Sequence, residues 1–109
     1  MTDLADLSLV EAADAVRNGD ATSMELLDAC WANLEAANAA LNATIWLDRE
    51  AAETSARAAD RAVREKSWLG PLHGVPLMHK DMYYQAGRLS TCGSAIRKDF
   101  RPAVTATVI

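Results

Sequence analysis

The sequence has few of the residues that build disulfide frameworks and metal centres. Its 109 residues include only two cysteines, Cys30 and Cys92, and two histidines. The cysteines lie far apart and form no CxxC pair, so a disulfide scaffold is excluded and a reducing compartment such as the cytoplasm is predicted. Two histidines and two scattered cysteines also lack the ligand spacing of a zinc site. Neither a metal nor a cofactor is expected.

Long apolar runs and a leader segment are absent as well. No run of about 18 apolar residues occurs, which excludes a transmembrane helix. No membrane partner is expected. The first residues include Asp3 and Asp6 and no basic segment, so no signal peptide is expected. With 50% hydrophobic and 24% charged residues, the composition is typical of a globular protein rather than a disordered one.

Charge divides the chain into two regions. Residues 1–66 hold 6 basic and 13 acidic side chains, a net charge of −7, whereas residues 67–109 hold 5 basic and 2 acidic side chains, a net charge of +3. Alanine is also concentrated in the first region. We interpret 1–66 as mostly helical and 67–109 as a segment of strands and loops.

Helix-start signals predict three helices in the first region. Ser8 with Glu11, and Thr22 with Glu25, have the spacing of capping boxes, and they predict helices over about 8–18 and 22–38 that pack as a pair. Asp48 is placed to cap a third helix over about 49–66. Its alanine-rich face allows a neighbour to approach closely.

Two short segments are candidate strands. Residues 44–47 are β-branched or bulky, which is typical of a strand. Residues 75–79 form the second candidate, and Pro76 restricts it to a sheet edge, a bulge or the start of a strand. Two strands cannot make an independently stable sheet, so we expect 67–109 to be poorly packed when isolated.

The most specific pattern in the chain is the run Gly-Pro-Leu-His-Gly-Val-Pro over residues 70–76, which is followed by Lys80-Asp81. Gly87 and the stretch Thr91-Cys92-Gly93-Ser94 come next. Together these elements resemble the amidase signature family. Upstream, Thr22-Ser23 with Glu25-Leu26-Leu27, and Leu41-Asn42-Ala43, resemble the N-terminal helices and first strand of that family. The resemblance therefore extends over nearly the whole chain.

This resemblance implies an α/β fold in which residues 1–109 supply N-terminal helices and the first strands of a mixed sheet within a single amidase domain. It implies a hydrolase that cleaves the C–N bond of a small-molecule amide with a Ser–cis-Ser–Lys arrangement. Lys80 occupies the position of the catalytic lysine, which takes a proton through a bridging serine. That chemistry is sound because a serine hydroxyl is a weak nucleophile until a base removes its proton.

Several neighbours of Lys80 have roles that the sequence leaves open. Asp81 is placed to orient either Lys80 or nearby backbone, whereas a tight pair with Lys80 would work against a base. His79 replaces the aliphatic residue common in the family, and we interpret it as facing the other side of the strand. His73 is interpreted as a structural hydrogen-bonding residue and Cys92 as a small buried thiol. The basic cluster of Arg97, Lys98 and Arg101 is interpreted as a solvated face.

The two serines of the arrangement have no counterpart in the sequence. The family's Gly/Ser-rich segment follows the lysine, and neither Ser90 nor Ser94 lies in such a context. We therefore expect the 109 residues to be an N-terminal fragment that does not hydrolyse amides by itself.

Two other functions remain open on the sequence alone. The A subunit of a tRNA-dependent amidotransferase resembles the same family; it releases ammonia from glutamine and works with partner subunits. A nucleic acid is expected as a partner only in that case. The third possibility is a non-catalytic helical interaction module, which the acidic and alanine-rich residues 1–66 allow. The oligomeric state is also open, with a homodimer as one option.

Overall fold

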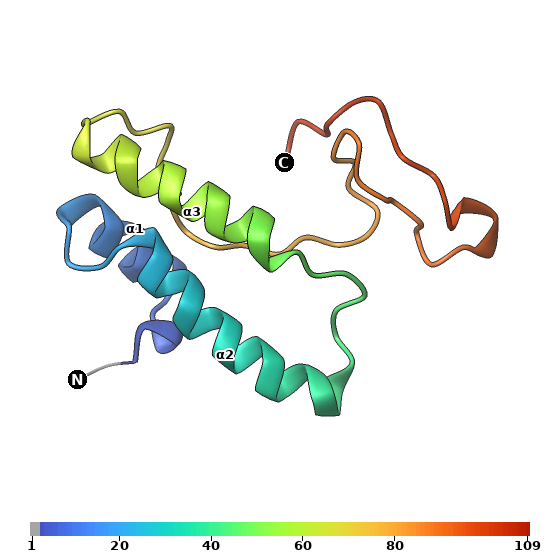
Figure 1. Ribbon diagram of the computed structural model, residues 1–109, viewed down its shortest axis with the longest axis horizontal. Helices are drawn as coiled ribbons and strands as arrows, with labels where there is room; N and C mark the ends of the chain where they lie inside the picture. Colours follow the sequence, from blue (N-terminus) through green and yellow to red (C-terminus); the bar gives the residue numbers. More distant parts are fainter. Residues whose placement is uncertain (1–2) are drawn as a thin grey trace. The chain divides into compact units, whose positions relative to one another are not determined.

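The computed structural model describes residues 3–109 and contains three α-helices and two short 3-10 helices within them. In chain order these are η1 (Leu4–Asp6), α1 (Leu9–Asn18), α2 (Ser23–Leu41), α3 (Arg49–Arg64) and η2 (Ala95–Arg97) (Figure 1). The chain forms two compact units, of which the first ends at Pro76 and the second spans Leu77–Ile109. None of the described helices is long and apolar enough to cross a bilayer.

Both predicted capping boxes are present and set the starts of α1 and α2. The Ser8 N–H donates to Glu11 Oε2 at 2.8 Å, and the Glu11 N–H donates to Ser8 Oγ at 3.3 Å. At α2 the Thr22 N–H donates to Glu25 Oε2 at 2.8 Å, and the Glu25 N–H donates to Thr22 Oγ1 at 3.1 Å. These bonds satisfy backbone donors that a helix start leaves free. The three predicted helices are thus confirmed, although α2 continues to Leu41.

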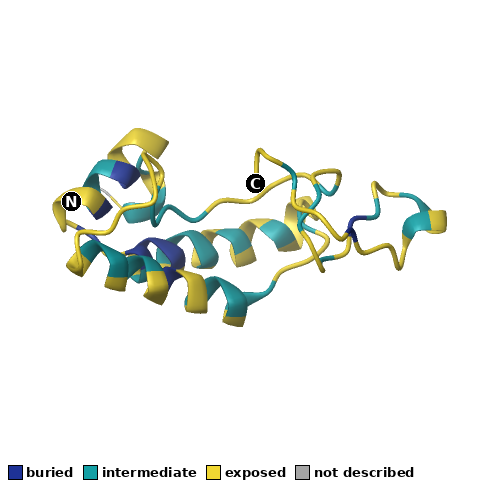
Figure 2. Cartoon of the chain, turned by 90° about the horizontal axis from the view of Figure 1, so that it is seen from above, coloured by how far each residue is buried: buried dark blue, intermediate teal, exposed yellow. Residues whose placement is uncertain are grey.

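The helical unit has a small core in which α1 and the start of α2 meet. Leu26 and Val16 are the most deeply buried large side chains, at 1% and 2% exposure. Alanines fill the space around them, and Val75 packs against this cluster from much later in the chain. Figure 2 shows that the buried residues concentrate in the helices.

Helices α2 and α3 lie side by side and antiparallel (Figure 1). The Asp60 carboxylate on α3 accepts the backbone N–H groups of Ser23 at 2.7 Å and Met24 at 3.3 Å, so a side chain of α3 caps α2. Near the other end of the pair, Arg49 donates to the carboxylates of Glu53 and Asp28, which links the start of α3 to α2. These polar contacts link α2 and α3 at two places along the pair.

The predicted strands are not present among residues 3–109, which corrects that part of the sequence interpretation. Residues 45–47 are exposed, with Ile45 at 75%. Residues 75–79 also lack strand structure. A strand requires a neighbouring strand to satisfy its backbone N–H and C=O groups, and apolar side chains alone do not replace that partner. In the second unit only Ser90 and Pro102 are buried.

Candidate functional site

The first half of the Gly70–Asp81 motif belongs to the helical unit. The Ser23 hydroxyl at the start of α2 donates to the Gly74 carbonyl at 2.6 Å, and Ser23 is only 3% exposed. Gly74 adopts a φ of +80°, and a Cβ there would lie 3.0 Å from Val16 Cγ1. Glycine is therefore required at this position for both its backbone conformation and its close approach to α1.

His73 fixes the same loop to α3. Its Nδ1 atom accepts the Leu69 N–H at 3.3 Å, and its Nε2 atom lies 3.0 Å from the Ala59 carbonyl oxygen. A carbonyl only accepts, so these contacts fit the tautomer that carries its proton on Nε2. The structural role predicted for His73 is confirmed.

Lys80 lies in the second unit, on an exposed turn in which its carbonyl accepts the Tyr83 N–H at 3.1 Å. Within residues 3–109 the Lys80 ammonium makes neither a hydrogen bond nor an ion pair. His79 is also exposed, and its Nδ1 atom lies 3.2 Å from the Lys80 carbonyl oxygen. The catalytic role of Lys80 stays a prediction, but its amine is not engaged elsewhere.

The sequence left open whether Asp81 orients Lys80 or nearby backbone, and the structure shows that it binds the backbone. Its carboxylate accepts both the N–H of Thr91, at 3.0 Å, and the Thr91 hydroxyl. Its carbonyl accepts the Cys92 N–H at 3.0 Å. The hydrogen bonds from Thr91, first from its hydroxyl and then from its N–H, lower the pKa of Asp81 below its ordinary value of 3.8. Asp81 thus anchors the turn at residues 91–93.

This anchor should depend on pH in a defined direction. Because the pKa of folded Asp81 is lower than that of an unfolded aspartate, its stabilisation is complete above about 3.8 and is lost as the pH falls through the folded value. We expect hydrogen exchange at the Thr91 and Cys92 amides, corrected for intrinsic rates, to lose protection over that acid range. Asp81→Asn should remove the pH dependence; an unchanged acid transition in this variant would contradict the assignment.

Cys92 corrects a second expectation, because it is exposed and not buried. The turn explains this: Cys92 has a φ of +52° and Gly93 a φ of +69°, so the chain reverses here and directs the thiol outward. The buried residue of this segment is Ser90, at 2% exposure, and its hydroxyl finds no partner in the described part of the chain. Ser94 makes no side-chain hydrogen bond as the cap of η2.

The basic cluster is only partly a solvated face. The Arg97 guanidinium lies 4.4 Å from the ring centroid of Phe100 and donates to the Tyr84 hydroxyl at 2.6 Å. Arg101 donates to the Gly87 carbonyl at 2.8 Å. Arg101 and Lys98 are exposed and agree with the prediction, Lys98 with a contact to Asp99. Arg97 is the one cation of the three that is partly buried within the second unit.

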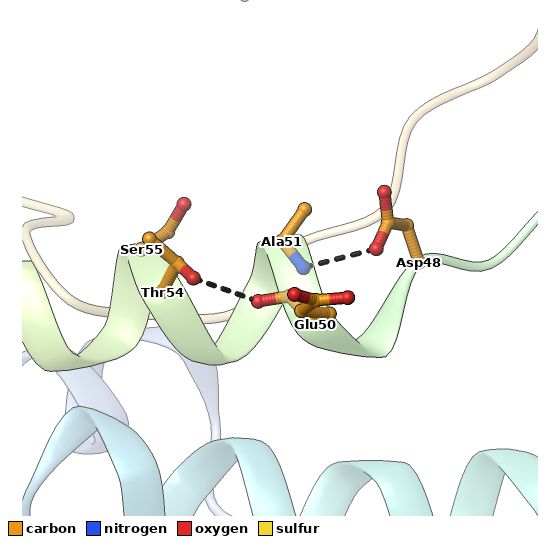
Figure 3. Close-up of a pocket in the computed structure, with 5 residues that line it drawn as sticks. All are labelled: Asp48, Glu50, Ala51, Thr54 and Ser55. Carbon is orange, nitrogen blue, oxygen red and sulfur yellow. Dashed lines mark hydrogen bonds between the residues drawn. The ribbon is translucent and has the colours of Figure 1, made fainter.

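Two hollows lie along α3, and neither contains Lys80. The first, of about 400 Å³, lies at the start of α3, where Asp48 accepts the Ala51 N–H at 2.9 Å and Thr54 donates to the Glu50 carbonyl at 2.9 Å (Figure 3). Two of its polar side chains, Asp48 and Thr54, thus bond to the backbone of the helix itself. The second, of about 680 Å³, lies between the alanine-rich face of α3 and residues 67–74. No group of three metal-binding side chains occurs in the described residues.

Comparison with known proteins gives a consistent result. The family model described as Amidase matches residues 25–109. The chain is 40% identical over its full length to the A subunit of the glutamyl-tRNA(Gln) amidotransferase of Chloroflexus aurantiacus, and 44% identical over 99% of its length to that of Methylocella silvestris. In both comparisons it spans 22% of the relative's length. The family match covers most of the chain, so this protein belongs to the Amidase family.

Proposed function

We propose that the chain is the N-terminal part of an amidase that hydrolyses the C–N bond of a small carboxylic amide, with Lys80 as the base. The observation that carries this proposal is that the Lys80 amine is unpaired in a chain of the Amidase family. The amine has no hydrogen-bond or ion-pair partner in residues 3–109, although the next residue in the chain is an aspartate. The bridging serine and the nucleophilic serine are proposed to lie outside the 109 residues.

The chemistry requires such an unpaired amine. A lysine removes a proton only in its neutral form, and a carboxylate in contact with it favours the charged form. An unpaired lysine next to the bridging serine would accept the proton that the nucleophile loses. This step accelerates reactions of this kind by about 10²- to 10⁴-fold.

The complete fold is proposed to be the α/β fold with a mixed sheet. Support comes from the exposed bulky residues 45–47, whose composition suits a strand that gains a neighbour in the complete protein. The helices of the first unit would then lie beside the sheet as peripheral elements. A cytoplasmic location, a single amidase domain and a homodimer belong to the same proposal.

The second candidate function is that of an amidotransferase A subunit. The specific observation that favours it is the name shared by the two relatives described above, each the A subunit of a glutamyl-tRNA(Gln) amidotransferase. In this case the substrate would be glutamine, and partner subunits would be needed to pass the ammonia to the charged tRNA.

Expression of the full-length protein tests these candidates. An amidase should release ammonia from simple carboxylic amides when purified alone. An amidotransferase A subunit should hydrolyse glutamine appreciably only after its partners are added. The 109-residue chain serves as the control and should be inactive on every substrate. Full-length protein that cleaves neither class of amide, with and without partners, would contradict the proposal.

A further inference from the structure

The chain contains two Lys-Asp dipeptides, and they behave differently. In Lys98-Asp99 the ammonium lies 3.9 Å from the neighbouring carboxylate, although both side chains are exposed. In Lys80-Asp81 the ammonium makes no such contact within residues 3–109. Adjacent lysine and aspartate side chains can therefore pair in this chain, and the absence of a pair at Lys80 needs a cause.

The Asp81 carboxylate is bound by Thr91, ten residues further along the chain. Its hydroxyl and its N–H both donate to the Asp81 carboxylate, and the two oxygens of that carboxylate are each used by one donor. The Thr91 hydroxyl then accepts the Gly93 N–H at 3.2 Å, which fixes its orientation. Hydrogen bonds to an ionised carboxylate are among the stronger ones in proteins. Within the described residues, the Asp99 carboxylate has no comparable hydroxyl or backbone donor.

We propose that Thr91 is a positioning residue that holds the Asp81 carboxylate away from Lys80 and so keeps the lysine amine unpaired. The inference rests on the proposed function for its catalytic meaning, because an unpaired amine matters only if Lys80 acts as a base. Thr91 acts through Asp81 and touches no reacting atom. Loss of its hydroxyl releases one carboxylate oxygen, which is then free to pair with the adjacent ammonium as Asp99 does with Lys98.

The test measures amine reactivity and needs no catalysis. The 109-residue chain has three lysines, so Lys66 and Lys98 serve as internal references for Lys80. We would label the chain with limiting acetic anhydride at one alkaline pH and quantify acetylation of each lysine by mass spectrometry. Thr91→Val should lower the relative reactivity of Lys80 about two- to fivefold, the size expected for a partly exposed ion pair. Thr91→Ser should behave like the unchanged chain.

A second substitution separates this role from a structural one. Asp81→Asn removes the charge, so Lys80 should keep its normal reactivity in Asp81→Asn and regain it in the double variant Thr91→Val/Asp81→Asn. If Thr91 only stabilised the turn, the double variant would be as impaired as Thr91→Val. That result, or a Thr91→Val chain that labels normally, overturns the inference. Because the Ser94 N–H donates to the Thr91 backbone carbonyl at 2.9 Å, hydrogen exchange at the Ser94 amide reports the turn in every sample, and loosening of the turn is measured independently of the charge.

Failure of this inference is distinguishable from failure of the proposed function. If Lys80→Ala leaves amide turnover by the full-length protein intact, the proposed function fails whatever the labelling shows. If Lys80→Ala abolishes turnover but Thr91→Val does not change the labelling, only the positioning role of Thr91 is wrong.

Discussion

Full-length protein carrying Lys80→Ala should lose amide hydrolysis by about 10²- to 10⁴-fold in kcat/KM, the contribution expected of a general base. The loss should fall mainly on kcat, because the role proposed for the amine is in proton transfer and not in substrate binding. Its stability should change little, since the side chain is exposed and makes neither a hydrogen bond nor an ion pair in the described residues. Steady-state ammonia release and thermal unfolding of the same preparations check both expectations.

Two control variants make this result specific. Lys80→Arg keeps the positive charge but provides a group that stays protonated, so it should be as inactive as Lys80→Ala. Lys98→Ala removes the other lysine that precedes an aspartate and should retain full activity. Substantial turnover by Lys80→Arg would show that the charge is sufficient and that Lys80 is not the base.

Gly74→Ala should lower the free energy of unfolding of the helical unit by about 2–5 kcal/mol, the sum of a backbone cost and a packing cost. The backbone part arises because a side chain at a φ of +80° costs about 1–2 kcal/mol. The other part is overpacking, about 1–3 kcal/mol, because the new Cβ would lie 3.0 Å from Val16 Cγ1 in the core. Urea denaturation followed by far-ultraviolet circular dichroism measures the change, since the helices give most of that signal.

Gly19→Ala is the matched control for this prediction. Gly19 has the same φ of +80°, but nothing lies within 4 Å of its Cβ position. This variant should lose only the backbone part, about 1–2 kcal/mol. The difference between the two losses of stability measures how tightly the loop at Gly74 packs against α1. Equal losses would show that the loop at Gly74 is not packed there.

The sequence predicts the helices well because their starts are encoded locally. Ser8 and Glu11 are three residues apart, and both bonds of the capping box form within that distance. The strands cannot be assigned in the same way, because residues 45–47 have strand composition but strand structure depends on a neighbour. The composition of residues 45–47 therefore indicates that they can form a strand beside a suitable neighbour, although they form none among residues 3–109.

The sequence does not predict the hydrogen bonds that join residues far apart in the chain. Asp60 and Arg64 are four residues apart, a spacing that suits an ion pair along α3, yet the Asp60 carboxylate caps α2 across 37 residues. Thr91 stands in the motif without an assigned partner, although it binds Asp81 ten residues earlier. Each is a short polar residue with ordinary local roles in turns and caps. Nothing in the local pattern distinguishes a threonine that anchors a distant aspartate from one that is merely solvated.

The hydrogen bonds that attach residues 71–74 to the helices bear on when the helical unit can fold during protein synthesis. Arg17, Ser23 and Ala59 all precede the loop residues that they bind, Pro71, Gly74 and His73. The segment that follows is Leu77–Ile109, and at about 5–20 residues per second a ribosome needs about 2–7 s to add it. Small helical units fold within microseconds to milliseconds. The nascent chain can therefore complete its helical unit before the segment that carries Lys80 has left the ribosome.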